Sequence, residues 1–327
     1  MIITRTPLRL PIGGGGTDLP FYYSHYGCSL TTAAIDKYAY ITIKSRFHRQ
    51  TRVCYSRVEE VDDNRKIEHP LVREALKLLD MRDNLEIVSI SDVAAGTGMG
   101  SSGSFLVGLL NALHTYKGES VSKTTLADEA CRIEMEILKE PVGKQDQFIA
   151  AFGGMQHMQI NKQGLVKIEP LNIKEDTVRE LEKNILLFYT NITRSASAVL
   201  GQQKKEAEID QEKLNHLTKI KEIGEEIKKA LEKGNTRRFG EWMNMHWELK
   251  RSLAKGMTNR DIDRWYGIAL ANGAIGGKIL GAGGGGFFML YCDTAQAELR
   301  KAMAKEGLAE LPFSFDFDGT KVIFNSK

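Results

Sequence analysis

The segment Gly281–Cys292, GAGGGGFFMLYC, restricts the fold of this chain more than any other feature of its sequence. Five of its first six residues are glycine, so the backbone there can reach conformations closed to other residues and can approach another group closely. These six residues satisfy the G-x-G-x-x-G pattern of dinucleotide-binding loops, but such a loop must open a helix. Here the β-type run FFMLYC follows. We therefore expect a glycine loop that enters a strand, which argues against a nicotinamide-dependent oxidoreductase.

A second glycine cluster, AAGTGMGSSGSF at Ala94–Phe105, leads into an apolar helical run that ends at Gly118. The N-terminus of a helix presents free N–H donors and a partial positive charge, which suit a phosphate group. A serine cap in a loop is the simpler explanation. However, the nine residues from Gly96 contain four glycines and three serines, more than a cap requires, so we favour phosphate binding. Ser104 stands where a P-loop needs lysine, and no serine here lies in G-x-S-x-G, which argues against a P-loop and a serine hydrolase.

Two acidic residues follow this cluster. Glu134 lies in a helical run, and Asp146 lies twelve residues later in PVGKQDQFIAAFGG, which we interpret as a loop. Mg²⁺ bound with a nucleotide needs one or two carboxylates, and a hydroxyl acceptor needs a base or an orienting carboxylate. Taken alone, Glu134 is better explained as a solvated helix residue. Asp146, beside Gly143 and Lys144, is the stronger candidate for a functional acid.

Hydrophobic periodicity predicts an α+β chain. Helices are expected at 70–80, 104–118, 124–140, 203–233, 235–253 and 294–307. Strands are expected at 1–10, in two runs within 28–47, and at 51–56, 85–91, 155–160, 165–171, 184–192, 277–292 and 319–325. The 327 residues exceed the usual size of one core, so we divide the chain into two mixed domains, 1–175 and 176–327.

The composition argues against several classes of partner. The net charge of +3 is too small to suggest nucleic-acid binding, although it suits an anionic small substrate. No run approaches the roughly 18 apolar residues of a membrane span, and the first residues lack the apolar run of a signal peptide. The four cysteines form neither a C-x-x-C pair nor a zinc-like pattern, so we expect reduced thiols in a cytoplasmic protein. The sequence leaves a homodimer open.

Three motifs together resemble those of the GHMP kinases, a family that includes galactokinase, homoserine kinase, mevalonate kinase and phosphomevalonate kinase. Pro7, Arg9 and Thr17–Asp18 are similar to the galactokinase signature, in which P-x-R precedes a glycine-rich turn ending in T-D. GTGMGSSGSF is similar to the family's nucleotide loop, and KILGAGGGGFF to its third motif, K-x-x-G-A-G-x-G-G. The Glu134-to-Asp146 spacing also matches. The resemblance implies an α+β fold of two domains, ribosomal-protein-like and then ferredoxin-like, with the site between them.

The resemblance implies a role for each motif in a reaction that uses ATP and Mg²⁺. Asp146 would orient or deprotonate the acceptor hydroxyl, and Arg9 would keep it ionised and stabilise the transferring phosphoryl group. Ser102 and Glu134 would hold Mg²⁺, with the hydroxyl of Ser101 or Ser104 as the less favoured ligand. The nucleotide would be held by Gly96, Gly98, Gly100, Ser101, Ser102, Gly103 and Ser104. The acceptor would contact Gly15, Gly16, Thr17, Asp18, Gly283 and Gly284.

Departures from the galactokinase pattern bear on the acceptor. Galactokinases have an acidic residue and a histidine where this chain has Gly15 and Gly16, so this pocket would be wider and would lack a negative charge. TPLRLPIGGGGTDLPFYY and AAIDKYAYITI resemble the branch that phosphorylates the anomeric hydroxyl of D-glycero-D-manno-heptose 7-phosphate, giving the 1,7-bisphosphate for nucleotide-activated heptose. Lys144 and Arg194 are candidate ligands for that acceptor's own phosphate, although each could equally be a solvated charge.

Two alternatives stay open at this point. One is another sugar 1-kinase of the family, acting on fucose, galactose or an unphosphorylated heptose. The other is a catalytically silent nucleotide- or sugar-binding regulator. The joint presence of Arg9, Ser102, Glu134 and Asp146 argues against the regulator, because a protein that only binds would not require all four.

Overall fold

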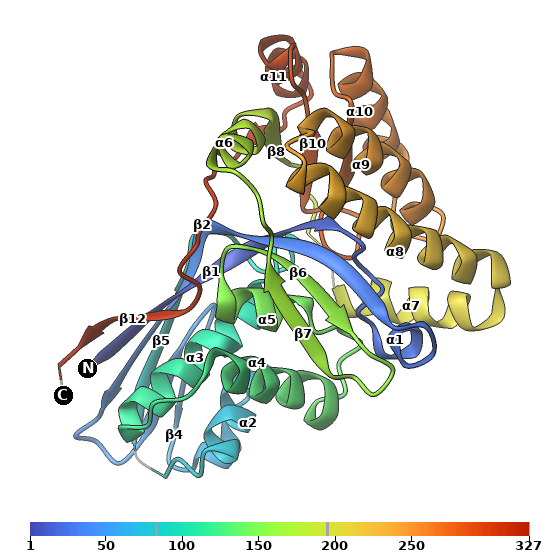
Figure 1. Cartoon of the computed structure of the whole chain (residues 1–327). Helices are drawn as coiled ribbons and strands as arrows, with labels where there is room; N and C mark the ends of the chain where they lie inside the picture. Colours follow the sequence, from blue (N-terminus) through green and yellow to red (C-terminus); the bar gives the residue numbers. More distant parts are fainter. Residues whose placement is uncertain (83, 194–195, 327) are drawn as a thin grey trace.

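A computed structural model describes residues 1–82, 84–193 and 196–326 of the chain. The described residues form a large sheet in the N-terminal half and a small sheet in the C-terminal half, with helices packed around both (Figure 1). The α+β architecture expected from the sequence is confirmed.

The large sheet has the strand order β12-β1-β2-β5-β3-β4. The long strand β2 pairs with β5 along its second half and with β6 along its first half, and β6 in turn pairs with β7. Every one of these pairs is antiparallel except β3 with β5. The strands are β1 (Ile2–Gly13), β2 (Cys28–Ser45), β3 (Thr51–Cys54), β4 (Val58–Val61), β5 (Leu85–Ser91), β6 (Met155–Ile160), β7 (Val166–Pro170) and β12 (Lys321–Asn325).

A shift in the register of β1 against β2, between Pro7 and Leu8, changes which face of the sheet each β1 side chain occupies. Before the shift, the hydroxyl of Thr4 donates to the carbonyl of Gly108 on the helix α3 (Ser101–Lys117). After it, Arg9 lies on the α3 side. Such irregularities often re-aim a side chain, and this one brings Arg9 to the face where the helices begin.

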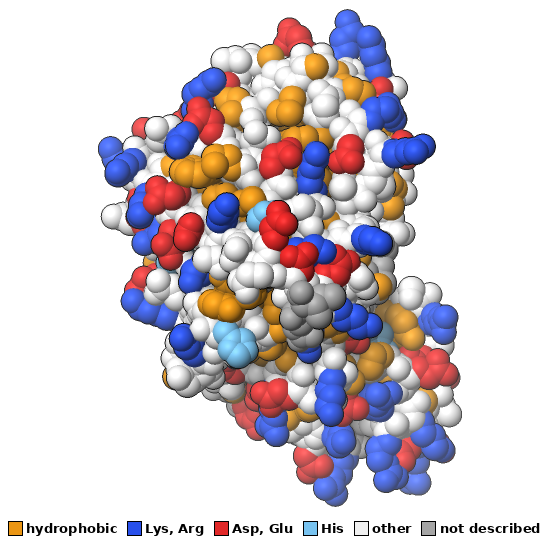
Figure 2. Space-filling view, turned by 90° about the vertical axis from the view of Figure 1, so that its right-hand side faces the viewer, with side chains coloured by type: hydrophobic (Ala, Val, Ile, Leu, Met, Phe, Trp, Pro, Cys, Tyr) orange, Lys and Arg blue, Asp and Glu red, His pale blue; other side chains and the backbone are white. Residues whose placement is uncertain are grey.

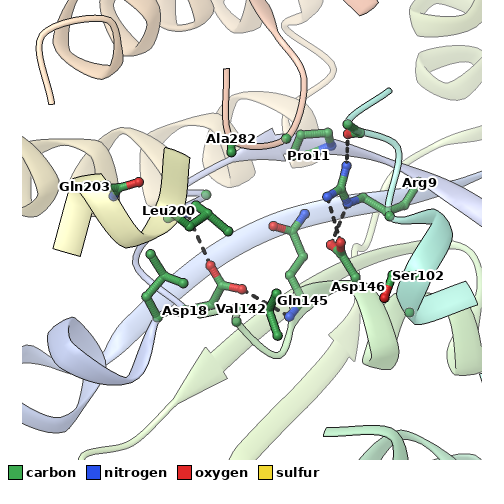
Figure 3. Close-up of a pocket in the computed structure, with 18 of the residues that line it drawn as sticks. Arg9, Pro11, Asp18, Ser102, Val142, Gln145, Asp146, Leu200, Gln203 and Ala282 are labelled. Carbon is green, nitrogen blue, oxygen red and sulfur yellow. Dashed lines mark hydrogen bonds and ion pairs between the residues drawn. The ribbon is translucent and has the colours of Figure 1, made fainter. Parts of the chain in front are cut away.

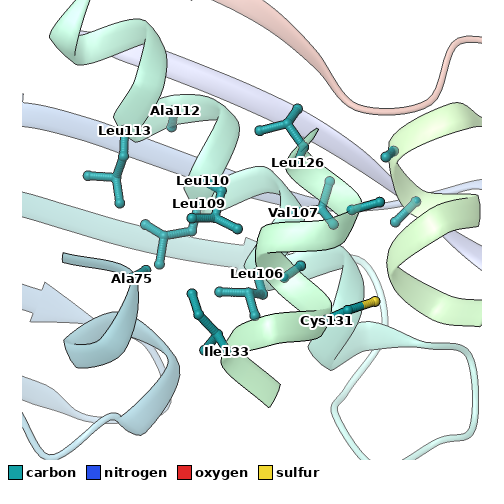
Figure 4. Packing of buried hydrophobic residues seen from close by; sticks show 14 of the residues in the cluster. Ala75, Leu106, Val107, Leu109, Leu110, Ala112, Leu113, Leu126, Cys131 and Ile133 are labelled. Carbon is teal, nitrogen blue, oxygen red and sulfur yellow. The ribbon is translucent and has the colours of Figure 1, made fainter. Parts of the chain in front are cut away.

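One face of the large sheet is covered by four helices and the main core. The buried side chains of α3 lie between the sheet and its neighbouring helices (Figure 4). Leu106, Val107, Leu109 and Leu110 are fully buried there, so the apolar run read from the sequence forms the centre of the N-terminal core. The other helices on this face are α2 (Pro70–Leu78), α4 (Lys123–Cys131) and α5 (Gln145–Phe152), with the short turns η1 (Asn64–Lys66) and η2 (Arg132–Ile137).

The small sheet has the order β11-β8-β10-β9, and all of its pairs are antiparallel. One face packs on α10 and α11, and the other faces the large sheet across a second core that also contains α8 and α9. Its strands are β8 (Ile185–Tyr189), β9 (Gly276–Ile279), β10 (Phe287–Tyr291) and β11 (Ala309–Glu310). The remaining helices are α1 (Pro20–Tyr26), α6 (Glu175–Asn184), α7 (Ala196–Ile209), α8 (Gln211–Glu232), α9 (Thr236–Lys250), α10 (Arg260–Ala271) and α11 (Gln296–Lys305).

The two halves are held together by a shared core and by the return of the last strand to the large sheet. The second core buries Leu8, Leu10 and Ile12 of β1 together with residues of α8, β8 and β10. In addition, β12 returns to the large sheet, where Ile2 pairs with Asn325. The division of the chain at residue 175 stays a prediction, and the last strand lies with the first half.

Three details of the secondary structure differ from the sequence predictions. The two β-rich runs within 28–47 form the single strand β2. The helix expected at 203–233 is interrupted at Asp210, whose side chain accepts hydrogen bonds from the backbone N–H groups of Glu212 and Lys213 and so starts α8 as a separate helix. The helices α1, α5, α6 and α10 and the short strands β4 and β11 were not among the elements expected.

Two surface properties complete the description. Basic and acidic side chains are interspersed on the face shown in Figure 2. Among the described helices, none is long and apolar enough to cross a membrane.

Candidate active site

The three glycine-rich segments meet at one cavity lined by both halves of the molecule (Figure 3). Together with the solvent-filled space at its open mouth, the cavity encloses about 1100 Å³. In chain order, the first segment, which follows Arg9, contributes Gly15 and Gly16. The second, Ala94–Phe105, contributes residues from Gly96 to Gly103, and the third, Gly281–Cys292, contributes Gly281 and Ala282. The cavity therefore collects the parts that the sequence predicted to act together.

The nucleotide loop lies at the N-terminus of α3. Its residues Gly96, Gly98, Gly100, Ser101, Ser102 and Gly103 line the cavity, as a phosphate site at a helix N-terminus requires. Ser104 does not line it. Its buried hydroxyl donates to the carbonyl of Pro7 at 2.7 Å, so it anchors α3 to β1 and is unavailable as the metal ligand considered from the sequence.

Arg9 and Asp146 form an ion pair in the middle of the cavity. The guanidinium donates through Nε to Oδ1 of Asp146 at 2.7 Å and through Nη2 to Oδ2 at 2.9 Å. Arg9 is only 6% exposed and also donates to the carbonyl of Gly98, so it links the acid to the nucleotide loop. This bidentate geometry fixes the plane of the carboxylate.

The interpretation of the Asp146 segment as a loop was wrong. Asp146 lies in the first turn of α5, which begins at Gln145. A carboxylate is favourable in the first turn of a helix because the free N–H groups there carry partial positive charge. The side chain thus sits on a rigid element.

Glu134 is held in a wide turn, η2, that has the hydrogen-bond spacing of a π-helix, as in the bond from the N–H of Leu138 to the carbonyl of Ile133. Such turns are frequent at functional sites. Glu134 is 3% exposed and accepts hydrogen bonds from the hydroxyl of Ser102 and the amide of Gln147. Burial raises its pKa, the hydrogen bonds from Ser102 and Gln147 oppose the rise, and Asp146 adds to it.

The Ser102–Glu134 pair fits a Mg²⁺ ion that also binds nucleotide phosphates. Both side chains present oxygen atoms, and they already lie in contact at the cavity wall. No group of three or more His, Cys, Asp or Glu side chains suited to a metal occurs among the described residues. One carboxylate and one hydroxyl leave further positions for phosphate oxygens and water, as is usual for Mg²⁺.

Gly15, Gly16 and Asp18 line the end of the cavity that the sequence predicts to hold the acceptor, which we call the acceptor end. The carboxylate of Asp18 accepts from the backbone N–H of Gln145 at 3.1 Å and from that of Gly16 at 3.2 Å. Burial raises the pKa of Asp18, and Asp146 raises it further. A Cβ at Gly143 would lie 1.9 Å from Oδ2 of Asp18, so only glycine fits there.

Several residues predicted to bind the substrate lie elsewhere. Thr17 is buried and its hydroxyl donates to the carbonyl of Gly14 at 2.7 Å. Lys144 is outside the cavity lining and donates to the carbonyl of Gly164 at 2.7 Å. Gly283 and Gly284 also lie outside the lining, because this part of the loop packs on Met257. Arg194 lies outside the described residues.

Other cavity residues were not singled out from the sequence: Gln147, Gln203, His246, Lys250 and Lys278. Lys278 is the lysine of the third motif, so its position in KILGAGGGGFF was an available signal. Gln203, His246 and Lys250 lie in the ordinary helical sequences of α7 and α9, which carry no local signal of function.

A helix N-terminus suited to phosphate, an oxygen pair suited to Mg²⁺ and a fixed carboxylate on one cavity are the parts expected of a small-molecule kinase. The comparisons with known proteins agree. Residues 70–154 match the model of the GHMP kinases N-terminal domain and residues 227–309 that of the GHMP kinases C-terminal domain. The chain belongs to the GHMP kinase family, and it is a phosphotransferase that acts on the hydroxyl group of a sugar. Use of ATP follows from the family.

Three relatives are similar along almost the whole chain. A D-glycero-alpha-D-manno-heptose 7-phosphate kinase of Campylobacter jejuni is 31% identical over 98% of both chains. A galactokinase of Pyrococcus furiosus is 24% identical over 94% of both. The crystal structure of a D-glycero-D-manno-heptose 1-phosphate kinase of Bacteroides thetaiotaomicron superimposes with a TM-score of 0.82, at 25% identity and full coverage of both chains.

Proposed function

We propose that this kinase transfers the γ-phosphoryl group of ATP to the anomeric hydroxyl of D-glycero-D-manno-heptose 7-phosphate, giving the 1,7-bisphosphate for nucleotide-activated heptose. The observation that carries the proposal is the 31% identity to the Campylobacter jejuni kinase over nearly the full length of both chains. The glycines at positions 15 and 16 support it, because they add neither a side chain nor a charge of their own to that end of the cavity. A cytoplasmic location and a homodimer stay predictions.

The cavity supports a direct transfer. Asp146 would accept the proton of the sugar O1 hydroxyl or hold it in place, while O1 forms a bond to the γ-phosphorus and the bond from that phosphorus to the bridging oxygen breaks, releasing ADP. The free N–H groups at the start of α3 and the guanidinium of Arg9 would stabilise the charge on the transferring group. Ser102 and Glu134 would hold Mg²⁺, which supplies charge neutralisation on the nucleotide phosphates.

An acceptor screen tests this function. The purified protein is given ATP and Mg²⁺ with heptose 7-phosphate, heptose 1-phosphate, unphosphorylated heptose, fucose and galactose, and ADP release is measured. We expect the highest kcat/KM with heptose 7-phosphate and a product that carries phosphorus on both O1 and O7 by ³¹P NMR. Preference for the 1-phosphate, as the name of the Bacteroides relative suggests for that protein, would instead mean transfer to a hydroxyl other than O1. Preference for fucose or galactose would point to another sugar 1-kinase, and binding without turnover to the regulator.

A further inference from the structure

The wall of the cavity that the C-terminal half supplies is basic and buried. It contains Lys278 of β9 and, from α9, His246 and Lys250. Lys278 and His246 are each 1% exposed and Lys250 is 8% exposed. Fully buried lysines are rare because an ammonium loses its hydration, so a pair of them at one cavity wall calls for an explanation.

The described residues around Lys278 do not balance its charge. Its Nζ donates to the carbonyl of Ile12 at 3.1 Å, and no described carboxylate lies within ion-pair distance. Within the same part of the chain, neither ring nitrogen of His246 has a hydrogen-bond partner. Lys250 donates to the carbonyls of Ile279 and Gly281. Lys278 and His246 therefore offer nitrogen atoms that can bind an anion and become protonated beside it.

The position of these groups in the cavity indicates whether they bind a phosphate of the acceptor or of the nucleotide. The carbonyl bonded to Lys278 belongs to Ile12, just before the glycines at positions 15 and 16 that line the acceptor end. Gln203 of α7 lies at the same end, 2% exposed, with its Nε2 unpartnered and close to Gly16. The nucleotide phosphates have their own donors at the start of α3.

We propose that Lys278 and His246, with Lys250 and Gln203 beside them, bind the phosphate group that the acceptor sugar already carries. This rests on the proposed function in so far as the acceptor is a sugar phosphate. Two ammonium groups and neutral N–H donors match a phosphate dianion in both charge and hydrogen bonding. In this proposal, these residues rather than Lys144 supply the positive charge that the sequence predicts near the acceptor's own phosphate.

The test compares a phosphorylated and an unphosphorylated acceptor in three variants. Lys278→Met removes the ammonium and keeps an unbranched chain, and His246→Leu removes the unpartnered imidazole. Lys221→Met is the matched control, because Lys221 also donates to a backbone carbonyl, that of Tyr26, but is only partly buried and lies outside the cavity lining. For each protein, kcat/KM is measured with heptose 7-phosphate and with heptose, together with the KM for ATP and the melting temperature.

We expect Lys278→Met to lower kcat/KM for heptose 7-phosphate about ten-fold or more, with kcat/KM for heptose and the KM for ATP little changed. His246→Leu should shift the same ratio in the same direction, and Lys221→Met should leave it unchanged. Equal losses with both acceptors, or a raised KM for ATP, in folded Lys278→Met and His246→Leu would overturn the subsite.

The acceptor preference of the wild type distinguishes a failure of the phosphate subsite from a failure of the proposed function. If the wild type favours a different sugar phosphate, the identity of the acceptor is wrong, and the same comparison with that sugar and its unphosphorylated form tests the subsite. If the wild type favours unphosphorylated sugars, the subsite is wrong even though the protein is a sugar kinase.

Discussion

Asp146 is the only acid of the described cavity lining that is locked by two hydrogen bonds from one guanidinium. It is thus placed to act on a hydroxyl without itself changing position. Arg9, which makes those bonds, reaches it because the register of β1 shifts just before it. At the scale of single residues, the proposed chemistry would depend on this pair and on the Ser102–Glu134 pair beside the nucleotide loop.

Asp146→Asn should lower kcat by about 10²- to 10⁴-fold, because an amide can neither accept the hydroxyl proton nor pair with Arg9 as an anion. ATP affinity should change little, since the nucleotide loop is intact. Steady-state kinetics and equilibrium binding of ATP measure the two quantities. Wild-type turnover in the variant would remove Asp146 from the reaction.

Glu134→Gln should raise the Mg²⁺ concentration for half-maximal activity about ten-fold or more. Burial raises the pKa of Glu134, so the proton competes with the metal as pH falls, and the wild type should need more Mg²⁺ at lower pH. That pH dependence should be lost in Glu134→Gln. Glu136→Gln, an exposed position on the same turn, is the control, and Mg²⁺ titrations that coincide for all three proteins would reject the ligand role.

Binding of the acceptor phosphate should take up a proton. Burial lowers the pKa of Lys278 well below its usual value, and Lys250 and Arg9 lower it further. The pKa of His246 is also lowered, mainly by burial and then by Lys278 and Lys250. A bound phosphate would oppose these effects, so calorimetry of heptose 7-phosphate binding in two buffers of different ionisation enthalpy should show net proton uptake near neutral pH. The uptake should fall in Lys278→Met, and equal uptake in both proteins would show that its source lies elsewhere.

At the scale of elements, local sequence predicted most of the regular structure. The apolar run after Ser104 forms α3, and the run after Gly286 forms β10, because each pattern has a clear period and its glycines mark the boundary. The wide turn at Glu134 was not predictable in this way, since it lies at the end of the helical run and too few residues follow it to show a change in apolar spacing. The break at Asp210 did have a local signal, because aspartate is a favoured N-cap residue. Periodicity of apolar residues does not register such a cap.

A histidine clamp ties the end of α3 to α4. Nδ1 of His114 pairs with Glu119 at 2.7 Å and Nε2 with Glu129 at 2.8 Å, and the hydrogen bond to Glu129 is the main reason that the pKa of His114 is raised. Its contribution to stability is therefore complete below the unfolded pKa of about 6.5 and is lost as the pH rises through the higher folded pKa. The free energy of unfolding should fall over that window, and His114→Gln should remove this part of the fall. Parallel pH curves for the two proteins, by urea denaturation, would contradict this account.

At the scale of the whole molecule, the site exists only where the two halves meet. Lys278, His246 and Gln203 come from three separate elements, and no local pattern in the sequence relates them. The motifs predicted that a kinase site would form, because each motif carries its own chemistry. They could not predict which wall of the cavity would be basic, since that depends on how β9, α7 and α9 pack together.

The contact between the second and third glycine segments couples the halves. A Cβ at Gly281 would lie 2.7 Å from the Cα of Gly98, and Gly281 has a φ of 62°, so alanine there would press on the nucleotide loop. We expect Gly281→Ala to raise the KM for ATP and to lower the melting temperature. Gly267→Ala, in α10 with open space around it, should instead stabilise the protein by about 0.5–1 kcal/mol. Unchanged ATP kinetics in Gly281→Ala would mean that the loops move independently.

The pairing of β12 with β1 has a consequence for the order in which the protein is made. Strand β1 leaves the ribosome long before β12, and its outer edge stays open until residues 321–325 have been synthesised, because Ile2 pairs with Asn325 and Arg5 with Lys321. An open strand edge can pair with another chain. During translation, therefore, the N-terminal half carries an unprotected edge for as long as it takes to make the C-terminal half, and the last strand to appear is the one that protects the first.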